Sequence, residues 1–133
     1  LLEKTLTVYA DGRQTRCFTY IDDTLQGTIL AATKEEAEGQ VFNIASVQEI
    51  SILALAEKIK GLTASPSEIV HVPYEEAYGQ HFNFEEARRR VPDVSKAEKI
   101  LGFRARINLE EGLKRTIAWF REAGYANEIE CLL

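Results

Sequence analysis

The chain has 133 residues, 45% of them hydrophobic and 28% charged, a composition typical of one folded domain. Its formal net charge of -5 at pH 7 argues against nucleic acid as a partner, because phosphate backbones attract basic surfaces. No apolar run reaches the roughly 20 residues that a membrane helix needs, so we expect no membrane contact.

Short strands are predicted at several places along the chain. Alternating β-branched and aromatic residues predict strands at residues 5–9 and 17–21, with a turn between them at Asp11-Gly12. The near-continuous apolar run at residues 41–45 is typical of a strand buried on both faces. Alternation returns at residues 67–72, which we also expect to form a strand.

Helices are predicted between these strands. Asp23, with Gln26 three residues later, has the layout of a helix cap and predicts a helix at residues 24–36. The spacing of its apolar residues places Leu25, Ile29 and Ala32 on the buried face.

Three further helix starts carry capping residues. Ser51 is expected to cap a helix that Gly61 ends, and Ser95 with Glu98 to open a short helix that Gly102 ends. Asn108 begins the clearest helix, whose apolar positions are Leu109, Leu113, Ile117 and Phe120. The order of elements indicates an α/β or mixed α+β fold, with short strands alternating with about four helices in a single domain, residues 1–133.

Two arginine-containing segments are candidate anion sites. In the loop at residues 11–16, Arg13 and Arg16 could offer guanidinium forks to a phosphate, although a solvated hairpin explains the spacing alone better. Residues 88–90 are three adjacent arginines, whose mutual repulsion is offset either by an anion or by Glu85 and Glu86.

Catalytic and metal chemistry find little support in the sequence. Asp22 and Asp23 could form an acid–base pair, but helix capping explains them better. The cysteines and histidines lack zinc-ligand spacing, and Cys17 and Cys131 are expected to be reduced, as in the cytoplasm. A glycine-rich dinucleotide turn, a phosphate loop and a Tyr-x-x-x-Lys pair are also missing, so we expect no catalytic residues in this chain.

An ordered set of motifs resembles a known family. They are LTVYADGRQTRCFTYIDD at residues 6–23, VFNIAS at 41–46, ISILALAE at 50–57, RRVPDVSKA at 89–97, LGF at 101–103 and LEEGL at 109–113. In this order they are similar to the C-terminal, substrate-binding part of extended short-chain dehydrogenases/reductases, the NAD-dependent nucleotide-sugar epimerases and dehydratases. The likeness is greatest to UDP-glucose 4-epimerases and UDP-glucuronate decarboxylases.

The resemblance implies a part of a Rossmann-type enzyme that lacks the N-terminal dinucleotide-binding half. The absence of methionine and the opening Leu1 agree with our expectation of a longer parent chain. In such enzymes the N-terminal half binds NAD and carries the catalytic tyrosine and lysine, so no cofactor is expected in this fragment. The C-terminal part holds the nucleotide of a UDP-sugar.

The resemblance also implies roles for particular residues. Arg16 would hold the diphosphate, with Arg89 or Arg90 as the second cation. Thr7, Val8 and Tyr9 would lie along the uridine, and Phe18 and Gln48 near the ribose or base. Ala10 stands where the family usually has glycine, and Cys17 where aspartate is frequent.

Other functional classes stay open at this point. The chain could be a stand-alone module that binds a nucleotide sugar without turning it over, or a folding unit without a ligand. In full-length relatives the strand at residues 41–45 belongs to the large Rossmann sheet. Without that neighbour it would expose apolar surface, so we expect a homo-oligomer.

Overall fold

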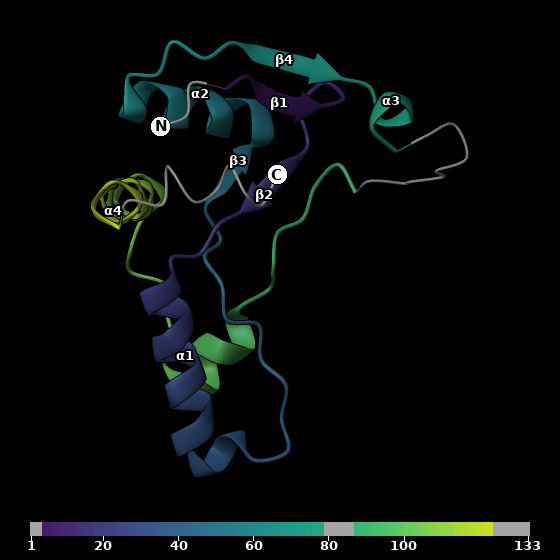
Figure 1. Cartoon of the computed structure of the whole chain (residues 1–133). Helices are drawn as coiled ribbons and strands as arrows, with labels where there is room; N and C mark the ends of the chain where they lie inside the picture. The colour runs from purple at the N-terminus through teal and green to yellow at the C-terminus, as the bar shows by residue number, and fades with distance from the viewer. Residues whose placement is uncertain (1–3, 79–86, 124–133) are drawn as a thin grey trace. The chain divides into compact units, whose positions relative to one another are not determined.

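The computed structural model describes residues 4–78 and 87–123, which divide into two compact units (Figure 1). Within the described residues, the first unit comprises 4–15, 50–78, 87–89 and 113–123. The second unit comprises 16–49 and 90–112.

A two-stranded parallel sheet organises the first unit. Strand β1 (Leu6–Tyr9) pairs with β4 (Ile69–Val72), with Thr7 opposite Val70. Helix α2 (Ile52–Thr63) packs against β1, beside the pair in Figure 1, and the short helix α3 (Tyr74–Tyr78) follows β4. Val8 is 1% exposed, so the centre of β1 forms part of this unit's buried interior.

The predicted cap of α2 is confirmed, and its predicted end is wrong. The Ser51 hydroxyl accepts a hydrogen bond from the N–H of Ala54 at 3.2 Å, which satisfies one of the free donors of the first turn. The helix continues past Gly61 to Thr63 and ends at Ala64, whose φ of 51° is left-handed. The Ala64 N–H bonds the carbonyl of Gly61, so this short side chain takes the position that glycine usually holds.

The second unit is built around helix α1 (Ile21–Thr33), the short helix η1 (Glu35–Ala37) and the π-helical turn η2 (Ala97–Leu101). Its buried core consists of Ala37, Ala97, Leu101 and Phe103. The partly buried hydrophobic residues around this core are Leu30, Ala31, Phe42, Ile44, Ile100 and Ala105. Segments that are distant in sequence therefore meet on one face of α1.

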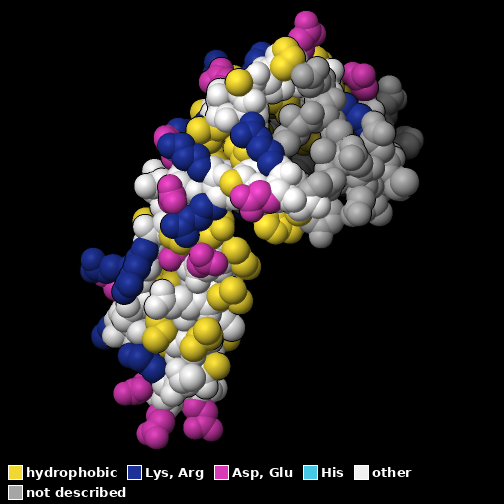
Figure 2. All heavy atoms as spheres, turned by 60° about the vertical axis from the view of Figure 1, so that its left-hand side comes forward, with side chains coloured by type: hydrophobic (Ala, Val, Ile, Leu, Met, Phe, Trp, Pro, Cys, Tyr) yellow, Lys and Arg dark blue, Asp and Glu magenta, His cyan; other side chains and the backbone are white. Residues whose placement is uncertain are grey.

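The predicted buried face of α1 is wrong. Leu25 and Ile29 are 53% and 60% exposed, whereas Gly27 is buried. An ideal Cβ at Gly27 would lie 2.3 Å from Cγ2 of Ile44 and 3.1 Å from Cδ2 of Phe103. The helix thus packs through its glycine, where close approach is possible, and leaves its larger side chains outside. On the face drawn in Figure 2, hydrophobic side chains lie open to solvent beside charged ones.

The predicted cap of α1 is also wrong. The helix begins at Ile21, and the N-cap residue Tyr20 makes no side-chain capping bond. Asp22 and Asp23 lie in the first turn, where a negative charge interacts favourably with the helix dipole. Asp23 is 3% exposed, and its carboxylate accepts hydrogen bonds from backbone outside α1, as described below.

Residues 41–45 do not form the predicted strand. Phe42 and Ile44 pack against the core, while Val41 is 83% exposed. Within the described residues no neighbouring strand pairs with this segment, and an extended backbone becomes a strand only through such pairing. The second sheet pairs β2 (Thr15–Cys17) with β3 (Glu49–Ser51), so the extended piece predicted at residues 17–21 lies earlier and is shorter.

The last two helix starts show one wrong cap and one confirmed cap. The N-cap residue of η2, Lys96, makes no side-chain capping bond, so the predicted Ser95 cap is wrong. The Asp93 carboxylate accepts the Ser95 N–H at 2.9 Å. Hydrogen bonds from the Ser95 hydroxyl and N–H lower the pKa of Asp93. Gly102 ends η2 at a φ of 67°, as predicted. Helix α4 (Leu109–Glu122) begins after Asn108, whose Oδ1 accepts the Glu111 N–H at 2.9 Å, and this cap is confirmed. The mixed α/β class is confirmed.

Candidate substrate pocket

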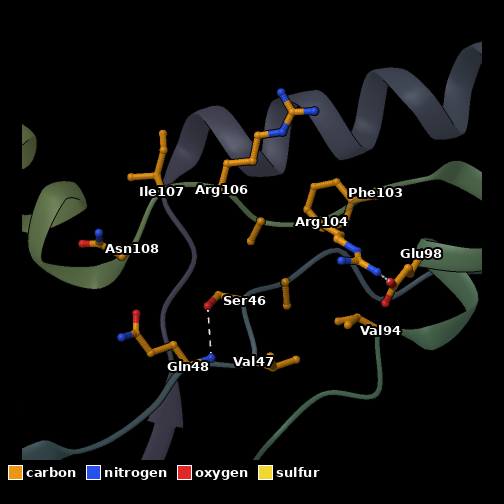
Figure 3. Close-up of a pocket in the computed structure, with 12 residues that line it drawn as sticks. Ser46, Val47, Gln48, Val94, Glu98, Phe103, Arg104, Arg106, Ile107 and Asn108 are labelled. Carbon is orange, nitrogen blue, oxygen red and sulfur yellow. Dashed lines mark hydrogen bonds and ion pairs between the residues drawn. The ribbon is translucent and has the colours of Figure 1, made fainter.

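A pocket of about 530 Å³ lies within the second unit (Figure 3). One wall is formed by residues 45–48 and the other by residues 103–108, with Val94 and Glu98 at the side. The lining combines hydrophobic side chains with a few polar and charged groups, as small-molecule sites do. The volume falls within the usual range for such sites, about 300–1,000 Å³.

Two side chains, one just before α1 and one in its first turn, hold the backbone of both walls. The Ser46 N–H donates to the Thr19 hydroxyl at 2.9 Å. The N–H groups of Arg106 and Ile107 donate to one carboxylate oxygen of Asp23, Oδ2, at 3.1 and 2.9 Å. Asp23 therefore accepts two backbone hydrogen bonds from a segment more than eighty residues away in sequence.

The polar lining presents amide donors. The Oε1 of Gln48 accepts the Leu109 N–H at 3.1 Å, and Asn108 uses its oxygen to cap α4. Among the described residues, no protein acceptor takes the N–H groups of either side-chain amide. The pocket therefore offers hydrogen-bond donors from Gln48 and Asn108, while Arg104 forms an ion pair with Glu98.

Gln48 is the predicted site residue that lines this pocket. Arg16, in β2, is half-buried, and Phe18 is 38% exposed. Arg90, which also belongs to the second unit, is exposed, and none of these three side chains lines the pocket.

The other predicted site residues belong to the first unit. Thr7, Val8 and Tyr9 form the strand β1, in which Val8 is buried and its two neighbours are exposed. The Tyr9 ring stacks on Tyr74, with 6.1 Å between ring centroids. Arg89 is exposed, and its backbone forms a parallel bridge with Thr15.

The loop at residues 11–16 makes the predicted turn. Gly12 has a φ of 67°, and a Cβ there would lie 2.7 Å from Cγ1 of Val8, so the position requires glycine. Ala10 also has a positive φ, 54°, at the position where the resemblance leads one to expect glycine. The loop is thus strained at Ala10, because an alanine rarely adopts this conformation.

Arg88 forms an ion pair with Asp11, an acid of the loop at residues 11–16. Its guanidinium lies 2.7 Å from Oδ2 of Asp11, and both side chains are largely exposed. The hydrogen bond from Arg88, supported by the Arg13 N–H, lowers the pKa of the Asp11 carboxyl. Glu85 and Glu86 were predicted as possible partners of the three arginines at residues 88–90. Both lie outside the described residues.

Several pocket residues were not predicted from the sequence. Four of them are Ser46, Arg104, Arg106 and Asn108. Ser46 closes the family motif at residues 41–46, and the other three belong to none of the quoted motifs. Two signals were present: the basic spacing of Arg104 and Arg106, and the capping position of Asn108. In the part of the chain that the structure describes, no group of three or more metal-ligating side chains comes together. None of the helices described is long and apolar enough to cross a membrane.

Comparison with known proteins defines the class to which this fold and pocket belong. A family model described as GDP-mannose 4,6 dehydratase matches residues 1–116. The chain belongs to this family of short-chain dehydrogenases/reductases, the NAD-dependent epimerases and dehydratases, which confirms the resemblance.

Individual relatives are more specific. The chain is 49% identical over 117 residues to a UDP-N-acetyl-alpha-D-glucosaminuronate decarboxylase of Bacillus cytotoxicus, covering 88% of this chain and 36% of the relative. It is 36% identical over 117 residues to UDP-glucuronic acid decarboxylase 1 of Danio rerio, covering 88% and 26%. The chain thus spans about a quarter to a third of the length of these relatives.

Solved structures agree with the fold. The UDP-glucose 4-epimerase of Thermotoga maritima with UDP-glucose has a TM-score of 0.78 and 29% identity, covering 91% of this chain and 36% of that chain. The UDP-glucuronic acid 4-epimerase of Bacillus cereus, in complex with UDP-glucuronic acid and NAD, has a TM-score of 0.77 and 27% identity, with the same coverage.

Proposed function

We propose that this chain is the UDP-sugar-binding part of an NAD-dependent decarboxylase or epimerase and acts in the cytoplasm. The observation that carries the proposal is the 49% identity to a relative named as a UDP-sugar decarboxylase. A second relative, 36% identical, carries a decarboxylase name for another UDP-sugar. The shared element of these names is the UDP group, so UDP is the part of the ligand that we assign to this chain.

The pocket chemistry supports a nucleotide. Its walls carry the aliphatic side chains of Val47 and Ile107, which suit the apolar face of a base. The amide groups of Gln48 and Asn108 present N–H donors, and uracil and phosphate both carry oxygen acceptors. We propose that Gln48 contacts the ribose or base, with Phe18 nearby and residues 7–9 along the uridine.

We assign the diphosphate to arginine. Guanidinium forks match phosphate oxygens in geometry and charge, and Arg16 is the half-buried arginine of the predicted site. We propose Arg89 or Arg90 as the second cation, as the resemblance implies. Binding energy from the diphosphate would position the sugar for reaction at a remote atom.

Among the described residues, no strand leads through a glycine-rich turn to a helix. Strand β2 reaches α1 through residues 18–20, β3 runs directly into α2, and β4 reaches α3 through Pro73. The glycine turn at Gly12 connects two strands. A dinucleotide site needs a glycine-rich turn between strand and helix. We therefore propose that NAD is bound by a segment outside this chain.

Titration calorimetry with UDP tests the proposal. The chain is expected to bind UDP, and Arg16→Ala to weaken binding by about tenfold or more, as expected for a charge-assisted hydrogen bond. Arg13→Ala is the matched control, because Arg13 is an exposed arginine of the same loop. Absence of UDP binding, or equal effects of the two variants, would refute the assignment. If the chain binds UDP but the protein that contains it does not turn over a UDP-sugar with NAD, a binding module without catalysis is favoured instead.

We also propose that the chain forms a homo-oligomer. Exposed hydrophobic side chains support this, since Ile21, Leu25 and Ile29 on α1 and Val41 are all more than half exposed. Light scattering at several concentrations tests it, and a monomer at every concentration would contradict it.

A further inference from the structure

We infer that Thr19 and Asp23 are positioning residues that set the separation of the two pocket walls without contacting the ligand. The inference rests on the proposed function, in which this pocket takes part of a UDP-sugar. Both residues lie within five positions of one another, at the entry to α1. Neither lines the pocket.

The contacts of these two side chains are directed at pocket-lining backbone. Thr19 accepts the N–H of Ser46 on one wall, and Asp23 accepts the N–H groups of Arg106 and Ile107 on the other. The three donor residues all line the pocket. A single turn of chain therefore holds both walls, which are about sixty residues apart in sequence.

The burial of Asp23 makes its contacts costly to replace. The residue is 3% exposed, and no lysine or arginine side chain pairs with it among the described residues. Its charge is satisfied by backbone N–H groups, and a buried carboxylate without such partners would be strongly unfavourable. The Asp23 carboxylate therefore holds residues 106–107 at one place relative to α1.

Further contacts complete the frame. The Ser46 hydroxyl accepts the Gln48 N–H at 3.1 Å, and Gln48 in turn accepts the Leu109 N–H at 3.1 Å. Figure 3 shows the resulting arrangement, with Ser46 and Gln48 opposite Arg106, Ile107 and Asn108. Because pre-ordered walls reduce the entropy lost on binding, loss of either anchor is expected to weaken ligand affinity.

Amide exchange in the absence of ligand tests the anchoring. Asp23→Ala is expected to lower the protection of the Arg106 and Ile107 N–H groups by about tenfold or more, and Thr19→Val to do the same at Ser46. Asp23→Asn keeps an acceptor oxygen and Thr19→Ser keeps a hydroxyl, so both are expected to restore protection in large part. The control is Asp22→Asn, an exposed acid on the same turn.

UDP affinity, measured by calorimetry below the unfolding transition of every variant, tests the consequence. Asp23→Ala and Thr19→Val are each expected to weaken UDP binding by about tenfold, with recovery in Asp23→Asn and Thr19→Ser. Affinities within about twofold of the original chain in Asp23→Ala and Thr19→Val, or equal loss in Asp22→Asn, would overturn the inference.

Two further outcomes are also decisive. If Asp23→Ala does not fold, Thr19→Val carries the test, and unchanged exchange at Ser46 together with unchanged UDP affinity in that variant would overturn the inference. If the original chain binds no UDP, the proposed function fails. The exchange data then decide the positioning role alone, and unchanged protection at Ser46, Arg106 and Ile107 would refute it.

Discussion

Replacing Gly27 by alanine tests the packing of α1 most directly. The new methyl group would lie 2.3 Å from Cγ2 of Ile44 and 3.1 Å from Cδ2 of Phe103, so a neighbouring side chain must move. Overpacking a core costs about 1–3 kcal/mol, while alanine regains about 0.5–1 kcal/mol of helix propensity. We expect the free energy of unfolding to fall by about 1–2 kcal/mol in Gly27→Ala.

Gly61→Ala is the matched control, because Gly61 lies in α2 and nothing is within 4 Å of an added Cβ. It is expected to raise the free energy of unfolding by about 0.5–1 kcal/mol through helix propensity alone. The assay is urea denaturation of both variants followed by far-ultraviolet circular dichroism. Equal stabilisation by the two alanines would refute the close contact between Gly27 and Ile44.

The remaining predictions concern a cap, a core residue and an ion pair. Ser51→Ala removes the acceptor of the Ala54 N–H and is expected to cost about 1 kcal/mol in urea denaturation. Leu101→Ala truncates a side chain that is 2% exposed and is expected to cost about 2–5 kcal/mol, whereas a loss similar to that of a surface truncation would contradict its core position. Arg88→Gln is expected to raise the lowered pKa of Asp11 toward its ordinary value of about 3.9, which an NMR titration of the carboxyl measures. Because folding lowers the pKa of Asp11, its ion pair with Arg88 stabilises the fold fully at pH values above the ordinary pKa. That stabilisation is lost as the pH falls through the lowered pKa.

Local signals in the sequence predicted part of the local structure, although the Ser95 cap and the helix end at Gly61 are wrong. The caps of Ser51 and Asn108 and the turn at Gly12 depend on residues within three positions, and each is confirmed. Gly102 ends η2 for the same reason, because a left-handed glycine after the last turn closes a helix through its nearest neighbours alone.

Signals that depend on distant segments failed. The spacing of Leu25 and Ile29 predicts a buried face, but the fit of Gly27 against Ile44 decides which face packs. Asp23 has the position of a cap, yet its partners are the N–H groups of Arg106 and Ile107. The pocket itself joins walls about sixty residues apart, and no motif connects them in the sequence.

Trp119 gives the chain an intrinsic optical reporter. It is the only tryptophan, it lies on α4 within the first unit, and its ring meets Phe120 edge-on with 5.0 Å between centroids. Its emission therefore senses the melting of that unit, whereas circular dichroism averages over the helices of both. Superimposable melting curves from the two signals would mean that the units unfold in one cooperative step. An earlier or later fluorescence transition would mean that each half of the architecture has a melting temperature of its own.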